Sequence, residues 1–208
     1  MADPTMDVGV PISTRPADLE LIPQDYFAPL DLAKIFPQAG PLEVDLGCGD
    51  GSFLIALAEE SPNRNFLGIE KLAGRVETAC RKGARRGLRN LRILRIETAY
   101  AIQYLLPPAS TETVHLLFPD PWPKRKHKRR RIVTPEFLAL VHRLLVDQGR
   151  LHIATDQETY FASIREVVSE SSFVEESATE RTFPLTTFEK RFVAQDLPIY
   201  RLELRKVS

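Results

Sequence analysis

Residues 42–51 read Leu-Glu-Val-Asp-Leu-Gly-Cys-Gly-Asp-Gly, a short apolar stretch that runs into three glycines spaced two apart. The apolar part predicts a strand over 42–46, and the apolar, helix-forming residues 53–58 beyond the glycines predict a helix. Gly47, Gly49 and Gly51 allow a tight turn between the two, because glycine adopts backbone conformations that side chains forbid. They also let a ligand approach bare backbone. The stretch therefore predicts a strand–turn–helix unit with a binding site at its turn.

Outward from this unit, strand-like and helix-like stretches alternate. We expect further strands at 66–69, 91–96, 114–118 and 151–154, near 173, and at 199–204. Apolar residues at helical spacing predict helices over 72–84, 135–145 and 160–168. Thr134-Pro135 is typical of a helix start, and Gly149 is the expected stop of that helix. Such alternation predicts an α/β fold, in which a parallel sheet carries helices on both faces and binds ligands at the carboxyl ends of its strands.

Length and composition are those of one globular domain. The chain has 208 residues, of which 43% are hydrophobic and 27% charged. It contains no apolar run long enough to span a membrane, and its first residues lack the apolar core of a secretory signal. Cys48 and Cys80 are too few for a disulfide framework. We expect a soluble, cytoplasmic protein with an N-terminal arm over residues 1–25 and a single domain over 26–208.

The formal net charge is zero, but the basic residues are unevenly spread. Residues 124–131 read Lys-Arg-Lys-His-Lys-Arg-Arg-Arg, so the remaining chain holds 21 basic residues against 28 acidic ones. Adjacent like charges repel one another, which favours an anionic partner over the alternative of a solvated face. The run therefore predicts contact with nucleic acid. A second basic group could extend this surface, although a solvated helix face is the favoured interpretation there: Arg75, Arg81, Lys82, Arg85 and Arg86.

The glycine turn differs from two common phosphate-binding patterns. A dinucleotide fingerprint needs a glycine where Ser52 stands, and a Walker loop needs a Gly-Lys-Ser/Thr ending that is absent. With Asp45 ahead of the glycines, the turn resembles the first motif of class I S-adenosylmethionine-dependent methyltransferases. Glu70 follows the second strand, where a carboxylate can accept hydrogen bonds from ribose hydroxyls. Glu97 follows the third, where the resemblance implies contact with the adenine amino group. Each acid alone could be a surface carboxylate, but three after three strands predict a nucleoside site.

A proline-rich stretch follows the fourth of these strands. Residues 118–124 read Phe-Pro-Asp-Pro-Trp-Pro-Lys, and the three prolines stiffen a loop that would carry Asp120 at the strand's carboxyl end. Trp122 either offers a face to a base or is buried as a structural residue. The string resembles the signature of bacterial tRNA (guanine-N7-)-methyltransferases, and the resemblance covers about residues 41–206.

This resemblance implies a Rossmann-like, mostly parallel seven-stranded sheet with an antiparallel C-terminal strand. It implies methyl transfer from S-adenosyl-L-methionine to N7 of a variable-loop guanine, position 46 of tRNA. Asp120 is then the catalytic residue. The cofactor is assigned to Asp45, Gly47, Gly49, Gly51, Glu70, Glu97 and Asp120, and the tRNA to Lys124, Asp156, Thr186 and Glu189. Two residues depart from the family pattern, because Asp45 is often Glu there and Glu97 is often Asp.

Several alternatives stay open. Asp156 could cap a helix, and Glu189 could form a surface ion pair with Lys190 or Arg191. The competing functions are a methyltransferase acting on an exocyclic amine, an NAD-dependent dehydrogenase and a non-catalytic RNA-binding module. No Cys/His cluster has the spacing of metal ligands, so we expect no metal. The oligomeric state stays open.

Overall fold

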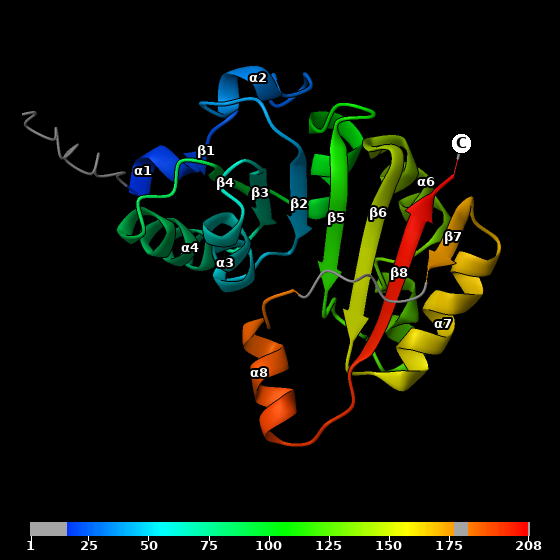
Figure 1. Cartoon of the computed structure of the whole chain (residues 1–208). Helices are drawn as coiled ribbons and strands as arrows, with labels where there is room; N and C mark the ends of the chain where they lie inside the picture. The colour runs from blue at the N-terminus through cyan, green and yellow to red at the C-terminus, as the bar shows by residue number, and fades with distance from the viewer. Residues whose placement is uncertain (1–15, 177–182, 208) are drawn as a thin grey trace, which may run out of the picture.

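The computed structural model describes residues 16–176 and 183–207. Its centre is one eight-stranded sheet in the order β1-β4-β3-β2-β5-β6-β8-β7 (Figure 1). β8 runs antiparallel to β6 and β7, and all other neighbouring strands are parallel. The strands are β1 (Glu20–Leu21), β2 (Leu42–Leu46), β3 (Asn65–Glu70), β4 (Leu91–Arg95), β5 (Thr111–Leu117), β6 (Leu145–Thr155), β7 (Phe173–Glu176) and β8 (Tyr200–Lys206).

Helices cover both faces of this sheet, as predicted. In Figure 1, α3 (Ser52–Glu60) and α4 (Ala73–Arg85) lie on the near face of β2–β4, and α6 (Pro135–Leu144) and α7 (Glu158–Ser169) lie behind β5–β8. Two buried clusters, one on each side of the sheet, form the core. The remaining elements are α1 (Pro16–Leu19), α2 (Leu32–Ile35), α5 (Thr98–Tyr100), the π-helix η1 (Ala101–Leu105), the 3₁₀-helix η2 (Arg125–Arg130) and α8 (Thr187–Ala194).

The seven strands expected from the sequence are all present, and β1 is an addition at the edge. Glu20 pairs with Ile93 of β4, and Leu19 is fully buried against Gly83 of α4. Residues 19–21 of the expected arm of residues 1–25 are therefore part of the folded sheet and core, because Leu19 is buried and β1 pairs with β4. Residues 1–15 of that arm lie outside the described residues.

The end of α6 corrects one expectation. The helix starts after Thr134, whose side chain accepts a hydrogen bond from the Phe137 amide, but it ends at Leu144 and not at Gly149. Gly149 instead lies inside β6, next to Gln148 at φ 63° and a shift in the β5–β6 register. A Cβ on Gly149 would lie 2.9 Å from the Val146 carbonyl oxygen, so this glycine serves a bulge in the strand.

The sheet positions the site by aligning the carboxyl ends of β2, β3, β4, β5 and β6 at one edge. In Figure 1, these strands point the same way, and α8 lies beside the ends of β5 and β6. No helix within the described ranges is long and apolar enough to cross a membrane.

Candidate active site

The glycine turn joins β2 to α3 as predicted. Gly47, Gly49 and Gly51 have φ angles of 86°, 56° and 73°, which L side chains rarely adopt. The turn is fastened to β3, because the Gly47 and Cys48 amides both donate to the Ile69 carbonyl oxygen. A Cβ on Gly51 would lie 2.7 Å from the Cβ of Ala79, whereas one on Gly47 would meet no atom within 4 Å. Gly51 therefore allows α3 to pack against α4, and Gly47 leaves open space beside the backbone.

Two buried carboxylates lie next to this turn. Glu70, at the end of β3, accepts hydrogen bonds from the Gly49 amide at 3.1 Å and the Leu72 amide at 2.9 Å. Arg75 lies 3.7 Å from the same carboxylate. Asp45 is 3% exposed, and burial, reinforced by the Glu70 charge, raises the pKa of its carboxyl to about 7. These contacts bring the first two predicted acids and the glycines together at one edge.

Glu97 stands after β4, as the sequence predicted, but its carboxylate has a structural partner. It is the residue before α5 and accepts a hydrogen bond from the Tyr100 amide at 3.0 Å. Its side chain therefore caps the first turn of α5. The predicted contact of Glu97 with adenine stays a prediction.

The proline-rich loop follows β5 and contains backbone strain on both sides of Asp120. Phe118 and Trp122 have φ angles of 54° and 42°, in the left-handed region. Such residues cost on the order of 1–3 kcal/mol each and persist only where neighbouring contacts hold them. The Phe118 amide donates to the Ala154 carbonyl oxygen at 2.8 Å, which ties the loop to β6. Asp120 is exposed at the end of β5, where the sequence placed it.

Aromatic residues of α8 pack on the same loop. The Phe118 ring lies 6.0 Å from the Phe188 ring and 5.4 Å from the Phe192 ring, between ring centres. Our sequence interpretation missed α8, although Phe188 and Phe192 stand four residues apart, a spacing that favours one helix face. The helix therefore connects the predicted Thr186–Glu189 motif to the loop that carries Asp120.

Thr186 and Glu189 form a capping box at the start of α8. The Thr186 hydroxyl accepts from the Glu189 amide at 3.0 Å, and the Glu189 carboxylate accepts from the Thr186 amide at 2.8 Å. The other Glu189 oxygen pairs with Arg201 at 2.7 Å. Glu189 is 6% exposed, so the alternative of a surface pair with Lys190 or Arg191 is wrong in both partner and exposure.

Asp156 follows β6 but does not cap α7. The residue before this helix is Gln157, whose side chain makes no capping bond, and Asp156 accepts from the Gln157 side-chain amide at 2.7 Å. The helix-cap interpretation of Asp156 is therefore wrong. Its carboxylate is half-buried at the same edge of the sheet as Asp120.

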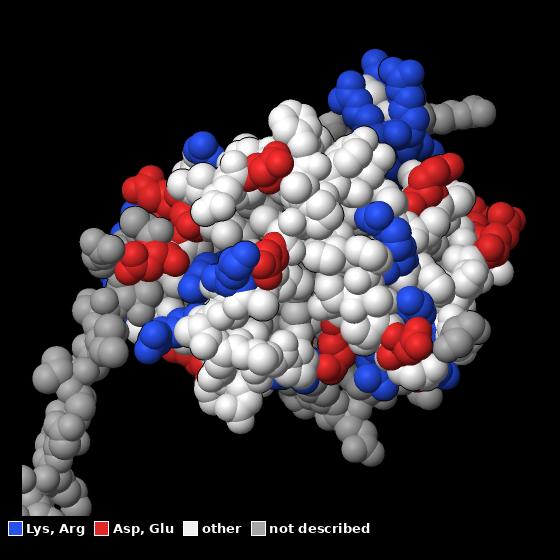
Figure 2. Space-filling model, turned by 90° about the horizontal axis from the view of Figure 1, so that it is seen from above, with Lys and Arg blue, Asp and Glu red and all other residues white. Residues whose placement is uncertain are grey.

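The basic run forms the 3₁₀-helix η2 and divides into two kinds of side chain. The exposed cations are Lys124, Lys126, Lys128, Arg129 and Arg130. Arg130 covers the Trp122 ring at 4.9 Å, and His127 meets that ring edge-on at 5.8 Å. Arg131 is 8% exposed and points inward, which corrects the expectation that the whole run faces a partner. In the face drawn in Figure 2, Lys and Arg gather in one projecting cluster, whereas elsewhere the two signs are interspersed.

Comparisons with known proteins match this arrangement. Residues 39–202 match the model of the family described as "Putative methyltransferase". A tRNA (guanine-N(7)-)-methyltransferase of Halorhodospira halophila is 34% identical over 85% of this chain and 79% of its own. One from Leifsonia xyli is 37% identical over 85% of this chain and 81% of its own. The chain belongs to the tRNA (guanine-N7-)-methyltransferase family.

Solved structures agree on the fold of this family member. A 16S rRNA methyltransferase, KamB, superposes with a TM-score of 0.63 at 15% identity, covering 86% of this chain and 93% of its own. The aminoglycoside resistance methyltransferase NpmB1 gives 0.57 at 20% identity, covering 85% and 92%. The fold is that of the Rossmann-like class I methyltransferases, which confirms the predicted fold class. Family membership also sets aside the dehydrogenase and the non-catalytic module.

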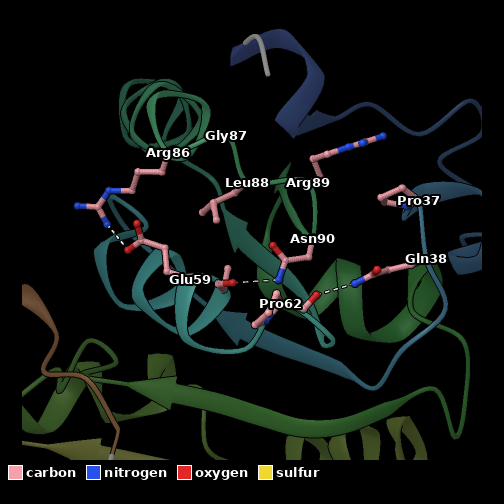
Figure 3. Close-up of a pocket in the computed structure, with 10 residues that line it drawn as sticks. Pro37, Gln38, Glu59, Pro62, Arg86, Gly87, Leu88, Arg89 and Asn90 are labelled. Atoms are coloured by element: carbon pink, nitrogen blue, oxygen red, sulfur yellow. Dashed lines mark hydrogen bonds and ion pairs between the residues drawn. The ribbon is translucent and has the colours of Figure 1, made fainter. Parts of the chain in front are cut away.

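One hollow of this methyltransferase lies away from the site. It has a volume of about 600 Å³ and opens between residues that precede β2, β3 and β4, at the opposite ends of these strands (Figure 3). There Arg86 forms an ion pair with Glu59 at 2.6 Å, and the Asn90 side-chain amide donates hydrogen bonds to backbone carbonyl oxygens. Arg86, Glu59 and Asn90 are therefore already paired, and none of the residues assigned to the cofactor or the tRNA lines the hollow. Within the described ranges no cluster of three or more His, Cys, Asp or Glu residues has the arrangement of a metal site.

Proposed function

We propose that the protein transfers a methyl group to N7 of a variable-loop guanine, position 46, of tRNA. The observation that carries this proposal is the position of Asp120. It stands on a stiff loop at the end of β5, in a member of the tRNA (guanine-N7-)-methyltransferase family, at the edge that also holds the glycine turn and Glu70. The reaction takes place in the cytoplasm, where tRNA is abundant.

The residues around the glycine turn suit S-adenosyl-L-methionine. Open space beside Gly47 admits a ligand to the backbone, and Glu70 presents a carboxylate at the end of β3 where ribose hydroxyls bind in such folds. Asp45, Gly49, Gly51 and Glu97 complete this half of the site. When bound, the cofactor supplies an electrophilic methyl group on a sulfonium.

The protein's own residues act mainly by positioning. Guanine N7 carries a lone pair and no proton, so its attack needs no strong base. Holding two reactants in line can lower a barrier by about 7–11 kcal/mol in favourable cases. Asp120 orients the guanine edge, and its negative charge stabilises the positive charge that develops on the methylated base.

The remaining predicted residues act on the tRNA side. Lys124, followed by Lys126, Lys128 and Arg129, is exposed beside the loop and suits phosphate groups. We assign to the tRNA Asp156, at the end of β6 beside β5, and the Thr186–Glu189 box, which starts the helix that packs on Phe118. Trp122 is covered by Arg130, so stacking of a base on this face would require Arg130 to move.

The test uses two tRNA transcripts that differ only at position 46. We expect 7-methylguanosine in the transcript with guanine there, after incubation with protein and S-adenosyl-L-methionine, and none in the transcript with adenine. Nucleoside analysis of digested tRNA measures both. Methylation at another position, or of an exocyclic amine, would contradict the proposal.

The Asp120→Asn variant tests the loop carboxylate. We expect its turnover to collapse while tRNA binding persists, because the substitution keeps the volume and removes the charge. Asp147→Asn, at an aspartate 79% exposed on β6, is the matched control and should turn over normally. Near-normal turnover of Asp120→Asn would leave Asp120 as a loop-shaping residue only.

A further inference from the structure

Arg131 is the last residue of the basic run and behaves unlike the rest of it. Its side chain is 8% exposed, whereas Lys128, Arg129 and Arg130 are exposed. Its amide closes η2 by donating to the Lys128 carbonyl oxygen at 3.0 Å. A buried guanidinium is unavailable to a phosphate, so this position calls for another role.

Three contacts hold the Arg131 guanidinium. Its Nε donates to the Pro121 carbonyl oxygen at 2.9 Å, and one terminal nitrogen donates to the Ser163 hydroxyl at 2.8 Å. The group also lies over the Tyr160 ring, 4.5 Å from its centre. Within the described residues no carboxylate lies within 4.0 Å of it, so backbone, hydroxyl and ring are its partners.

The residues beneath Arg131 form a rigid base. Tyr160 is 1% exposed, and its hydroxyl accepts from the Val133 amide at 3.5 Å. The Ser163 hydroxyl donates in turn to the Tyr160 carbonyl oxygen at 2.9 Å within α7. Arg131 therefore connects the loop that follows β5 to the first two turns of α7.

The loop needs such an anchor, because little else sets the direction of Asp120. Within the described residues the Asp120 carboxylate has no hydrogen bond or ion pair, so its position follows from the backbone around it. That backbone is strained at Phe118 and Trp122. The Pro121 carbonyl, the next acceptor after Asp120, is the one that Arg131 holds.

We propose that Arg131 is a positioning residue for methyl transfer: by holding the Pro121 carbonyl oxygen against Tyr160 and Ser163, it fixes the loop so that the Asp120 carboxylate faces the substrate. This inference rests on the function proposed above for Asp120. Under this proposal, Arg131 contributes to methyl transfer, whereas the exposed cations of the same run contribute to tRNA binding.

The charges of Asp120 and Arg131 both influence the Tyr160 hydroxyl, which supports the proposal that Arg131 acts on the position of Asp120. Burial raises the pKa of the Tyr160 hydroxyl most, the Arg131 charge lowers it, and the Asp120 charge raises it. The carboxylate and the guanidinium thus both act electrostatically on the Tyr160 hydroxyl, and Arg131 also contacts the Tyr160 ring.

The test compares Arg131→Gln, Arg131→Lys and Ser163→Ala with a matched control. Arg143→Gln removes an arginine that likewise donates to backbone carbonyls, those of Ile102 and Gln103, away from the loop. The measurements are the single-turnover methylation rate at saturating tRNA, tRNA affinity as a function of salt, and thermal stability, with rates taken well below every melting temperature.

We expect both Arg131 variants to slow single turnover by about tenfold to a hundredfold, since a displacement of about 1 Å at a reacting centre costs up to that much. Lysine restores the charge without the planar fork, so Arg131→Lys should remain slow. Ser163→Ala should give a smaller loss in the same direction, and Arg143→Gln none. The salt dependence of tRNA binding should match wild type throughout.

Three results would overturn the proposal. Weakened binding with a flatter salt dependence and an unchanged rate would make Arg131 a phosphate ligand. Lower thermal stability with a normal rate would make it structural. Additive losses in the Asp120→Asn, Arg131→Gln double variant would show that Arg131 does not act through Asp120. Normal turnover of Asp120→Asn alone would instead refute the function assigned to Asp120.

Discussion

At the scale of single residues, Asp45 and Glu70 are two like charges buried close together. Both are buried beside the glycine turn, and burial together with the Glu70 charge raises the pKa of Asp45 from 3.8 to about 7. Glu70 accepts hydrogen bonds from two amides, and Asp45 takes up a proton as the pH falls through about 7. A site that binds a cationic sulfonium benefits from negative charge held in this way.

The raised pKa of Asp45 predicts how stability depends on pH. Between pH of about 4 and 7, the folded protein keeps a proton on Asp45 that the unfolded chain has released, so its contribution to the free energy of unfolding falls as pH rises through this window. Asp45→Asn should remove this loss and stabilise the protein at pH 8 more than at pH 5. Urea denaturation at both pH values, with Asp147→Asn as the exposed control, measures it. Parallel pH profiles for wild type and Asp45→Asn would contradict the raised pKa.

At the scale of elements, α8 is the part of the site whose stability depends most on local sequence. It has eight residues, is anchored by the Phe118 contacts and Arg201, and is started by the Thr186–Glu189 box. Short isolated helices are unstable in water, so a cap matters more here than in α4 or α6. The box gives both residues a structural role beside the substrate role that we propose.

Replacing Thr186 by alanine separates these roles. Loss of the cap should destabilise α8 by about 1 kcal/mol, with Thr187→Ala, the next and exposed threonine, as control. Hydrogen exchange of the α8 amides should accelerate in Thr186→Ala alone. If Thr186 acts only as a cap, turnover should fall only in proportion to the fraction of molecules in which α8 is unfolded, as hydrogen exchange measures it. A larger fall assigns the hydroxyl to the substrate, and unchanged exchange would contradict the capping role.

At the scale of the whole molecule, charge is segregated. The chain is neutral overall, yet the exposed cations of η2 and Lys124 stand together beside the active-site loop. Three basic residues in or directly after α4 are different, because Arg81 pairs with Glu77, Lys82 with Asp50 and Arg86 with Glu59. This pairing supports the interpretation of α4 as a solvated face, and η2 remains the surface that we propose for phosphate binding.

Two triple variants with the same change in charge test this assignment. Lys126, Lys128 and Arg129 replaced by Gln should weaken tRNA binding and flatten the log–log salt slope by about 2, since each lost phosphate contact removes up to about 0.7–0.9. Arg81, Arg85 and Arg86 replaced by Gln should leave the slope close to wild type. The measurement is tRNA affinity against salt concentration. Equal flattening in both variants would mean that net charge alone attracts the tRNA.

The sequence by itself determined the seven main strands and the helices between them, α3, α4, α6 and α7, in their order along the chain. Apolar runs and helical spacing identified the seven main strands, and the glycines of 47–51, Glu70 and Asp120 were placed at strand ends where the structure has them. These features are local: a strand's side-chain period, a glycine's φ and a proline-stiffened loop depend on neighbouring residues. Gly149 misled because a bulge and a helix stop both favour glycine.

Tertiary structure alone decided where side chains point and with whom they pair. Nothing in residues 124–131 distinguishes Arg131 from Arg130, because its inward direction depends on Pro121 and on Ser163, 32 positions further along the chain. The partner of Glu189 is likewise a distant residue, Arg201, and β1 depends on pairing with β4 and on the packing of Leu19 against Gly83 of α4. Burial, and with it the raised pKa of Asp45, is a property of the assembled sheet, since desolvation requires atoms from several strands around one carboxylate.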